Sequence, residues 1–321
     1  MTDSSLIFII SQPRSGSSLL QQLLLNNIEI VSSPEPWQML SLIYTYKKNN
    51  IASSYNPFYA VENFTRYLDE REDGFEDYKN RVKKLALDLY KDRLGEHQYF
   101  LDKTPRYYHI IKELYEFFPN AKFIFLVRNP LAVFASILDY NFKGDYKKFL
   151  KSEDRIDDLF LAPKLVEEGI KIIKDSITIS YEDLITNTDN TLKKINSFLS
   201  LETPLQADYE VKGSFSNSKH VDTKSLDKHS KPVSDYLDSW KKTINTIQKK
   251  QLALEYLAKL QQVDSSRYNI REIEKMLKVH STDKTNLFSI PLDLLINREE
   301  KLSIFQLIKK RILIKLNKKG L

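Results

Sequence analysis

The sequence predicts an α/β fold: a P-loop-type parallel β-sheet flanked by helices, with helical insertions and a C-terminal helical tail. One observation behind this class is that short apolar runs alternate with helical patterns rather than with hairpin turns. The runs lie at residues 6–10, 28–33, 98–101, 122–127 and 175–185. Strands that alternate with helices form a parallel sheet through right-handed crossovers. The second observation is a strand, a turn-rich loop and a leucine-rich helix in direct succession over residues 5–25.

The loop of this first unit, residues 11–16, is a candidate anion site. A strand, a loop and a helix in this order direct backbone N–H groups and a helix N-terminus to one point, where phosphate oxygens bind. Arg14 supplies a guanidinium, and Gly16 allows the tight turn before the helix. Further donors are the hydroxyls of Ser15, Ser17 and Ser18. An ordinary strand-to-helix turn is the alternative at this point.

The loop departs from the Walker sequence of P-loop kinases, G-x-x-x-x-G-K-[ST]. Ser11 replaces the first glycine and Ser17 replaces the lysine, whereas Gly16 and Ser18 match. In the kinases the lysine reaches the β- and γ-phosphates, and the hydroxyl after it holds Mg²⁺. Without the lysine the loop can bind a phosphate but is poorly suited to moving a γ-phosphoryl group.

Composition indicates a folded protein with an anionic ligand. Of the 321 residues, 41% are hydrophobic and 12% aromatic, enough to fill a core. There is no cysteine, no membrane-spanning run of roughly 20 apolar residues and no signal-peptide pattern, so the cytoplasm is the expected location. The net charge of +6 suits an anionic ligand but is too evenly spread to indicate nucleic acid. The five histidines lack the paired spacing of zinc ligands.

Charged residues follow the second, third and fourth strands, at the end of the sheet where α/β folds bind ligands. Glu35 lies between Pro34 and Pro36, which predict an extended backbone for it. The alternative role for Glu35 is an acidic residue at a helix start. Lys103 follows the third strand in the segment DKTP, where a solvated surface lysine is the alternative. Arg128 follows the fourth strand where kinases commonly place a Mg²⁺-binding Asp, so it favours a second anion rather than a metal.

The segments between the strands are predicted to be mostly helical. Pro130 suits the first turn of a helix that carries Ser136 on an inward turn. Residues 37–96 form a helical insertion, either as a lid beside the acceptor or as a packing layer. A helix is expected at residues 188–199, and a long polar loop at 213–233.

The predicted α/β domain covers residues 1–285, and residues 286–321 form a basic amphipathic C-terminal tail. Residues 301–321 contain seven Lys or Arg residues among aliphatic ones and no acidic residue. A helix of this kind either packs on the domain or lies on an anionic membrane surface. Peripheral membrane contact through the tail is therefore an open alternative.

Three of these segments together resemble the sulfotransferases that use 3′-phosphoadenosine 5′-phosphosulfate (PAPS), in their bacterial and protein-tyrosine branch. QPRSGSSLL is similar to the 5′-phosphosulfate loop, and LVRNPLAVFAS to the 3′-phosphate motif with its Arg and Ser eight residues apart. SYEDL resembles the stretch whose Tyr lies near the adenine. The likeness covers about residues 5–240 and implies transfer of a sulfuryl group from PAPS to an acceptor hydroxyl. The product would be 3′,5′-bisphosphoadenosine (PAP), and no metal would be needed.

The resemblance also implies roles for single residues. Those implied to bind the co-substrate are Arg14, Ser15, Gly16, Ser17, Ser18, Arg128, Ser136, Tyr181 and Lys231. Glu35 would be the general base that deprotonates the acceptor hydroxyl. Lys103 and Arg14 would neutralise charge on the leaving phosphate. Lys231, in SKPV, resembles a lysine of the cofactor loop.

Some features depart from the animal cytosolic enzymes, and rival classes remain. The TYPKSGTTW-type loop and the RKGxxGDW motif are absent, and no histidine is a clear base, although His97 and His109 flank the third strand. A P-loop kinase-like phosphotransferase should show the missing lysine and a strand-end Asp. A non-catalytic anion- or lipid-binding protein would not need Glu35 beside the phosphate loop. No residue indicates whether the acceptor is a sugar, a lipid, a sterol or a peptide.

Overall fold

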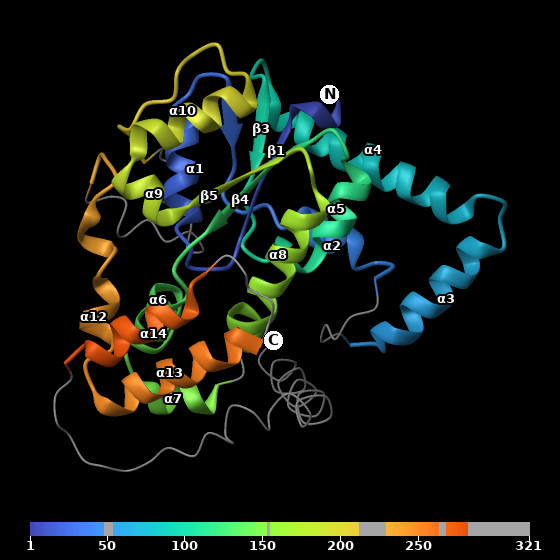
Figure 1. The fold of residues 1–321 in the computed structure, drawn as a ribbon. Coiled ribbons are helices and arrows are strands. Elements are labelled where there is room, and N and C mark those ends of the chain that lie inside the picture. The colour runs from blue at the N-terminus through green and yellow to red at the C-terminus, as the bar shows by residue number, and fades with distance from the viewer. Residues whose placement is uncertain (48–53, 153–154, 212–228, 263–267, 282–321) are drawn as a thin grey trace, which may run out of the picture. The chain divides into compact units, whose positions relative to one another are not determined.

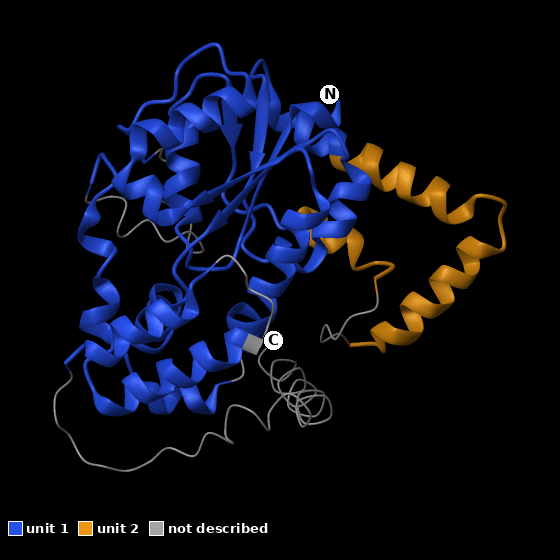
Figure 2. Cartoon of the chain, in the orientation of Figure 1, with its two compact units in different colours: residues 1–37, 87–289 blue, residues 38–86, 290–321 orange. Residues whose placement is uncertain are grey.

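The computed structural model describes residues 1–47, 54–152, 155–211, 229–262 and 268–281 (Figure 1). The chain divides into two compact units, which Figure 2 shows in different colours. One comprises residues 1–37 and 87–289, and the other residues 38–86 and 290–321.

Five parallel strands form the sheet of the first unit, in the order β2-β3-β1-β4-β5. They are β1 Leu6–Ser11, β2 Ile30–Ser32, β3 Tyr99–Asp102, β4 Lys122–Val127 and β5 Ser176–Ser180. Ile7 of the central strand β1 aligns with Leu101 of β3 and with Lys122 of β4. Every residue of β1 is buried, as expected for a parallel strand covered on both faces. The predicted fold class is confirmed.

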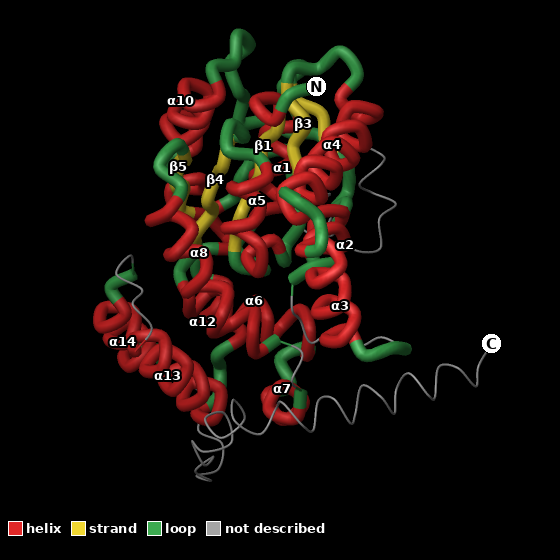
Figure 3. Tube along the Cα trace, turned by 90° about the vertical axis from the view of Figure 1, so that its right-hand side faces the viewer, coloured by secondary structure: helices red, strands yellow, loops and turns green. Residues whose placement is uncertain are grey.

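Helices cover both faces of this sheet. The helices described in the first unit are α1 Ser17–Leu25, α5 Ile111–Phe117, α6 Pro130–Phe142, α7 Tyr146–Lys151, α8 Ala162–Ile172, α9 Tyr181–Thr186, α10 Thr188–Leu199, α12 Ser239–Thr243, α13 Ile247–Gln262 and α14 Ile270–Val279, in addition to the end of a longer helix given below. Short 3₁₀ turns lie at Asp3–Ser5, Tyr107–Ile110 and Ser234–Tyr236, and a π-helical turn at Asp157–Leu161. Figure 1 shows α1, α9 and α10 on one face and α5 and α8 on the other. Figure 3 shows α13 and α14 packed side by side.

The side chains of β1 alternate between these two layers, because successive residues of a strand point to opposite faces. Ile7 and Ile9 pack in one apolar cluster with leucines of α1 and α10. Phe8 lies on the other face, where its ring contacts those of Tyr107, Phe118 and Phe123. The core therefore holds β1 rigidly, and with it the loop that follows β1.

The described residues of the second unit are helical. They comprise α2 Gln38–Ile43, α3 Pro57–Asp69 and the first part of α4 Gly74–Leu94. Asn56 caps α3 by accepting a hydrogen bond from the Phe58 N–H, and Pro57 occupies the first turn. The helical pattern predicted for residues 37–96 is thus observed, whereas its role beside an acceptor stays a prediction.

Two local predictions were wrong or incomplete. β5 ends at Ser180, earlier than the predicted run to residue 185, because the Ser180 hydroxyl accepts from the Asp183 N–H and starts α9. Glu35 has a φ of +21° instead of the extended backbone predicted between two prolines. The predicted boundary at 285/286, the tail and residues 213–228 of the predicted loop lie outside the described residues. No helix in the described part of the chain is long and apolar enough to cross a membrane.

Candidate active site

A cavity of about 910 Å³ lies at the carboxyl ends of the strands. One residue that follows each of the five strands lines it: Arg14, Glu35, Lys103, Arg128 and Tyr181. They meet because parallel strands all end at the same edge of the sheet. The structure therefore brings together the strand-end residues that the sequence singled out.

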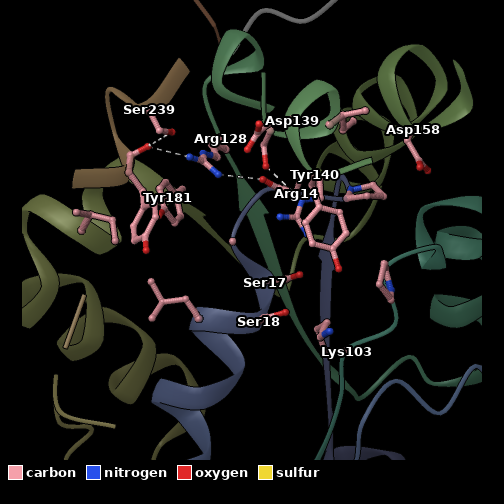
Figure 4. A pocket seen from close by; sticks show the side chains of 18 of the residues that line it. Arg14, Ser17, Ser18, Lys103, Arg128, Asp139, Tyr140, Asp158, Tyr181 and Ser239 are labelled. Atoms are coloured by element: carbon pink, nitrogen blue, oxygen red, sulfur yellow. Dashed lines mark hydrogen bonds between the residues drawn. The ribbon is translucent and has the colours of Figure 1, made fainter. Parts of the chain in front are cut away.

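The loop after β1 turns into α1 at Gly16. Gly16 has a φ of +94°, and a Cβ placed on it would lie 2.3 Å from the Tyr181 ring. The N–H groups of the first turn of a helix have no intrahelical partner, and here that turn carries Ser17 and Ser18, which line the cavity. Figure 4 shows both hydroxyls on the side of the helix that faces Lys103.

Ser15 differs from the other predicted serines. Its side chain is fully buried, and its N–H donates to the Gln12 carbonyl at 3.2 Å. Its hydroxyl has no hydrogen-bond partner among the described residues and does not line the cavity. The structure thus gives Ser15 a place in the turn rather than in the cavity wall.

Arg14 links the loop to α6. Its backbone has a φ of +71°, and its Nε donates to the Ser136 Oγ at 3.2 Å. Its guanidinium lies 4.0 Å from the centroid of the Tyr140 ring, one helical turn beyond Ser136. Both α6 residues line the cavity, so the two motifs that the sequence placed 122 residues apart are in direct contact.

Arg128 is buried beside the loop. Its Nη1 donates to the Arg14 carbonyl at 3.1 Å and its Nη2 to the Tyr236 carbonyl at 3.2 Å, while its guanidinium lies 4.1 Å from the Tyr181 ring centroid. Burial lowers the pKa of Arg128, nearby Tyr181 and Glu182 raise it, and Arg14 lowers it further. The buried Nε has no hydrogen-bond partner among the described residues. A buried cation with an unused donor is suited to an anionic ligand.

Glu35 and Lys103 form an ion pair in the cavity wall. The Lys103 Nζ donates to the Glu35 Oε1 at 2.6 Å, and the side chains are only 1% and 9% exposed for Lys103 and Glu35. The Trp37 N–H lies 3.4 Å from the Thr104 Oγ1, a second contact between the segment of Glu35 and the end of β3. These tertiary contacts explain why Glu35 leaves the extended conformation that Pro36 favours.

Asp102, the last residue of β3, holds the backbone next to the Glu35–Lys103 pair in place. It is fully buried and accepts hydrogen bonds from the hydroxyls of Tyr90 at 2.6 Å, Tyr107 at 2.7 Å and Thr104 at 2.9 Å. Burial raises the pKa of Asp102 to about 6, although the three hydroxyls and Lys103 act in the opposite direction. The network fixes the backbone directly before Lys103.

Lys231 and the histidines considered from the sequence lie in the cavity wall or outside it. Lys231 lines the cavity, and its exposed side chain pairs with Asp208 at 3.1 Å. The His97 ring interacts with the Ile28 carbonyl at 2.7 Å, and neither His97 nor His109 lines the cavity. His229 does line it, at the end of the predicted loop.

Several cavity residues were missed by the sequence reasoning: Trp37, Arg106, Tyr140, Arg155, Asp158 and His229. Two had a usable signal, since Arg106 directly follows DKTP and Tyr140 follows Ser136 by one helical turn. Arg155 and Asp158 lie in a charged helical stretch whose pattern distinguishes no single residue.

Known proteins are similar to parts of this chain in sequence. Residues 6–204 match the sulfotransferase family. The nodulation protein NoeE of Sinorhizobium fredii is 28% identical over 145 residues, which cover 40% of this chain and 30% of the relative. An uncharacterized protein of Aquifex aeolicus is 29% identical over 144 residues, covering 44% of this chain and 18% of the relative. The chain thus spans less than a third of the length of these curated relatives.

A solved structure has the same fold. The sulfotransferase domain from the curacin biosynthetic pathway superposes with a TM-score of 0.53 at 19% sequence identity, covering 79% of this chain and 96% of that domain. At this identity the likeness concerns the fold alone.

Proposed function

The chain belongs to the sulfotransferase family, whose members transfer sulfuryl groups, and we propose that it uses PAPS as donor and a hydroxyl group as acceptor. One observation carries the proposal furthest. The 2.6 Å pair of Glu35 and Lys103 lines the same cavity as Arg14 and Arg128. A carboxylate that can take a proton therefore lies in the same cavity as the cations Arg14, Lys103 and Arg128.

The described residues fit a nucleotide that carries acidic groups at both the 3′ and the 5′ position of its ribose. Arg128, with its unused buried Nε, and Ser136 would hold the 3′-phosphate. Tyr181 and Lys231 would line the adenosine. The first turn of α1, with Ser17 and Ser18, would hold the 5′-phosphosulfate. Figure 4 shows these two groups apart, with Arg128 and Tyr181 on one side of the cavity and Ser18 and Lys103 on the other.

The chemistry of the protein is positioning, proton removal and charge neutralisation. When bound, PAPS supplies the sulfuryl group, whose bond to the 5′-phosphate breaks as the acceptor oxygen attacks sulfur. Glu35 would take the proton of the acceptor hydroxyl. Lys103 holds the Glu35 carboxylate in place and would donate to the oxygen on which charge develops, together with Arg14. Because these cations supply the positive charge, we propose a reaction without a metal.

Calorimetry with PAP and with ATP tests the choice of nucleotide. We expect PAP to bind without Mg²⁺ and far more tightly than ATP with Mg²⁺. Transfer of label from PAPS to hydroxylated glycans, lipids, sterols and peptides then identifies the acceptor. Mg²⁺-dependent ATP binding as tight as that of PAP, without transfer to any acceptor, would contradict the proposal.

The variant Arg128→Ala tests the site of the 3′-phosphate. Removing the guanidinium should weaken PAP binding by about 2–3 kcal/mol, because a charged hydrogen-bond partner is lost. The control ligand is AMP, which lacks the 3′-phosphate and should lose much less affinity. An equal loss for PAP and AMP would place the 3′-phosphate elsewhere.

A further inference from the structure

A cluster of two arginines and one carboxylate lines the cavity without a role in the proposed reaction: Arg106, Arg155 and Asp158. The Asp158 Oδ2 accepts from the Arg106 Nη2 at 3.0 Å and from the Arg155 Nη1 at 3.2 Å. Asp158 is 1% exposed, whereas Arg106 and Arg155 are 28% and 32% exposed. The carboxylate is therefore buried in the wall, whereas the two arginine side chains are partly exposed.

The carboxylate of this cluster is saturated and cannot serve a ligand itself. Its second oxygen, Oδ1, accepts from the Tyr108 hydroxyl at 2.7 Å. The Asp158 carbonyl accepts from the Gln12 Nε2 at 2.8 Å, which ties the cluster to the loop that carries Arg14. Asp158 lies in the π-helical turn Asp157–Leu161, a rare geometry that is frequent at functional sites.

The two guanidiniums, by contrast, have N–H donors that do not bind another side chain. Two positive charges face one negative charge, so the cluster has a net charge of +1. Each arginine donates one hydrogen bond from a terminal nitrogen to Asp158, and within the described part of the chain neither makes a second side-chain hydrogen bond. A guanidinium has five N–H donors in a planar fork that matches an oxyanion. Asp158 thus holds two such forks in fixed positions at the cavity.

The cluster lies at the side of the cavity opposite the proposed nucleotide-binding residues. Figure 4 shows Asp158 beyond Arg14 and Tyr140, on the side away from Arg128 and Tyr181. Arg106 also follows the proposed catalytic residue Lys103 by three positions, across the turn of Thr104 and Pro105. A ligand group bound here would share the cavity with the Glu35–Lys103 pair and would lie away from Tyr181, the residue proposed to line the adenosine.

We propose that Arg106 and Arg155 bind an oxyanion on the acceptor, so that the acceptor class is a hydroxylated compound that carries a carboxylate or a phosphate. This inference rests on the proposed function, because it assigns the second substrate of that reaction. The arginines act by binding and orienting the acid group, which places the acceptor hydroxyl at Glu35. Neutral sterols, neutral sugars and simple alcohols would lack the group that the cluster binds.

Paired probes test the proposal on protein saturated with PAP. The pairs are methyl β-D-glucuronide with methyl β-D-glucoside, and 4-hydroxyphenylacetate with its methyl ester. The 6-phosphate of methyl β-D-glucoside separates a preference for phosphate from one for carboxylate. Calorimetry should show that the acid member of at least one pair binds roughly tenfold more tightly, or more, than its neutral partner.

Variants then assign this preference to the cluster. Arg106→Gln and Arg155→Gln should each remove most of the preference for the acid, and Arg155→Lys should keep part of it because the charge remains without the fork. Arg93→Gln, an exposed arginine of α4 outside the cavity, is the matched control and should change nothing. PAP affinity and melting temperature, measured alongside, report whether each variant is folded.

The outcomes are distinct. Equal affinity for acid and neutral probes in both pairs, or a preference that survives both Gln variants, would overturn the inference. So would a loss of PAP affinity in folded Arg106→Gln or Arg155→Gln, since the arginines would then belong to the nucleotide site. If the wild-type protein does not bind PAP at all, the proposed function fails instead.

Discussion

At the scale of single residues, the Glu35–Lys103 pair is the feature on which the proposed reaction depends. Both side chains are almost inaccessible to water, so each charge is stabilised chiefly by the other. Breaking such a pair leaves an uncompensated charge in the wall. A test of the base should therefore keep a hydrogen-bond acceptor beside Lys103 while it removes the ability to take a proton.

Glu35→Gln meets this requirement. Its amide oxygen can still accept from Lys103, and no residue proposed to contact a phosphate changes, so the PAP affinity should stay the same. Turnover should fall by something like 10²–10⁴-fold, the usual contribution of a positioned general base. Single-turnover sulfuryl transfer, measured together with PAP binding, provides both quantities.

His97→Ala and His109→Ala serve as controls, because neither histidine lines the cavity. Both should keep their rate. A Glu35→Gln enzyme with nearly normal turnover would remove Glu35 from the role of base. A His97→Ala or His109→Ala variant that binds PAP but has lost activity would point to that histidine.

At the scale of elements, the loop between β1 and α1 depends on a glycine for two separate reasons. The φ of +94° at Gly16 disfavours any other residue, and the Tyr181 ring occupies the space where a Cβ would go. Tyr181 also lies under the Arg128 guanidinium, so a shift of this ring would disturb the second motif.

Gly16→Ala should therefore lose stability and PAP affinity together. Its matched control is Gly95→Ala, where φ is also positive, at +56°, but nothing lies within 4 Å of the added Cβ. The control should lose only about 1 kcal/mol for the strained backbone, with normal PAP binding. Chemical denaturation and calorimetry on both variants separate strain from steric clash. Equal stability losses and normal PAP binding in both would show that the Tyr181 contact is unimportant.

Asp102, at the end of β3, makes the stability of the protein depend on pH. Burial raises the pKa of Asp102 from 3.8 to about 6, so the folded protein favours the protonated acid more than the unfolded chain does. The contribution of Asp102 to the free energy of unfolding is fully present below about pH 4 and is lost as the pH rises through about 6. A shift of about two pKa units corresponds to a free energy on the order of 3 kcal/mol.

Asp102→Asn removes this titration while it keeps a side chain that can accept from the two tyrosines. Between pH 4 and pH 7, the wild type should lose stability relative to Asp102→Asn by up to roughly 3 kcal/mol. Urea denaturation of both proteins across this range measures the difference, and other titrating groups cancel. Parallel stability profiles would contradict the raised pKa.

At the scale of the whole molecule, the net charge of +6 combines a cationic cavity with a basic end of the chain. The cavity accounts for part of that charge through Arg14, Lys103 and Arg128. The seven basic residues of 301–321 lie outside the described residues, and their role stays a prediction from the sequence. The two roles predicted for this segment are packing on the domain and peripheral contact with an anionic membrane surface.

Co-sedimentation with liposomes tests the tail. The full chain should pellet with anionic vesicles more than a chain that ends at Glu300, because each basic residue near such a surface adds about 1 kcal/mol. Neutral vesicles are the control and should retain neither protein strongly. If both chains pellet equally with anionic vesicles, the tail is a packing element.

The sequence by itself determined the parallel sheet and the edge at which the residues after its strands meet. Apolar runs that alternate with helices define the strands, and parallel strands bring their following residues to one edge. For this reason the amino-acid sequence alone was enough to assign Arg14, Glu35, Lys103 and Arg128 to one site. The signal in each case is local, since it needs only the strand and the few residues after it.

Tertiary structure alone decided how these residues meet one another. The order β2-β3-β1-β4-β5 is not the order of the chain, so partners such as Arg14 and Ser136, or Arg106 and Asp158, are distant in sequence. The positive φ of Glu35 also opposes its local preference, because the contact with Lys103 outweighs the restriction before Pro36. Local patterns report on neighbours within a few residues, whereas these contacts arise only when distant segments pack against each other.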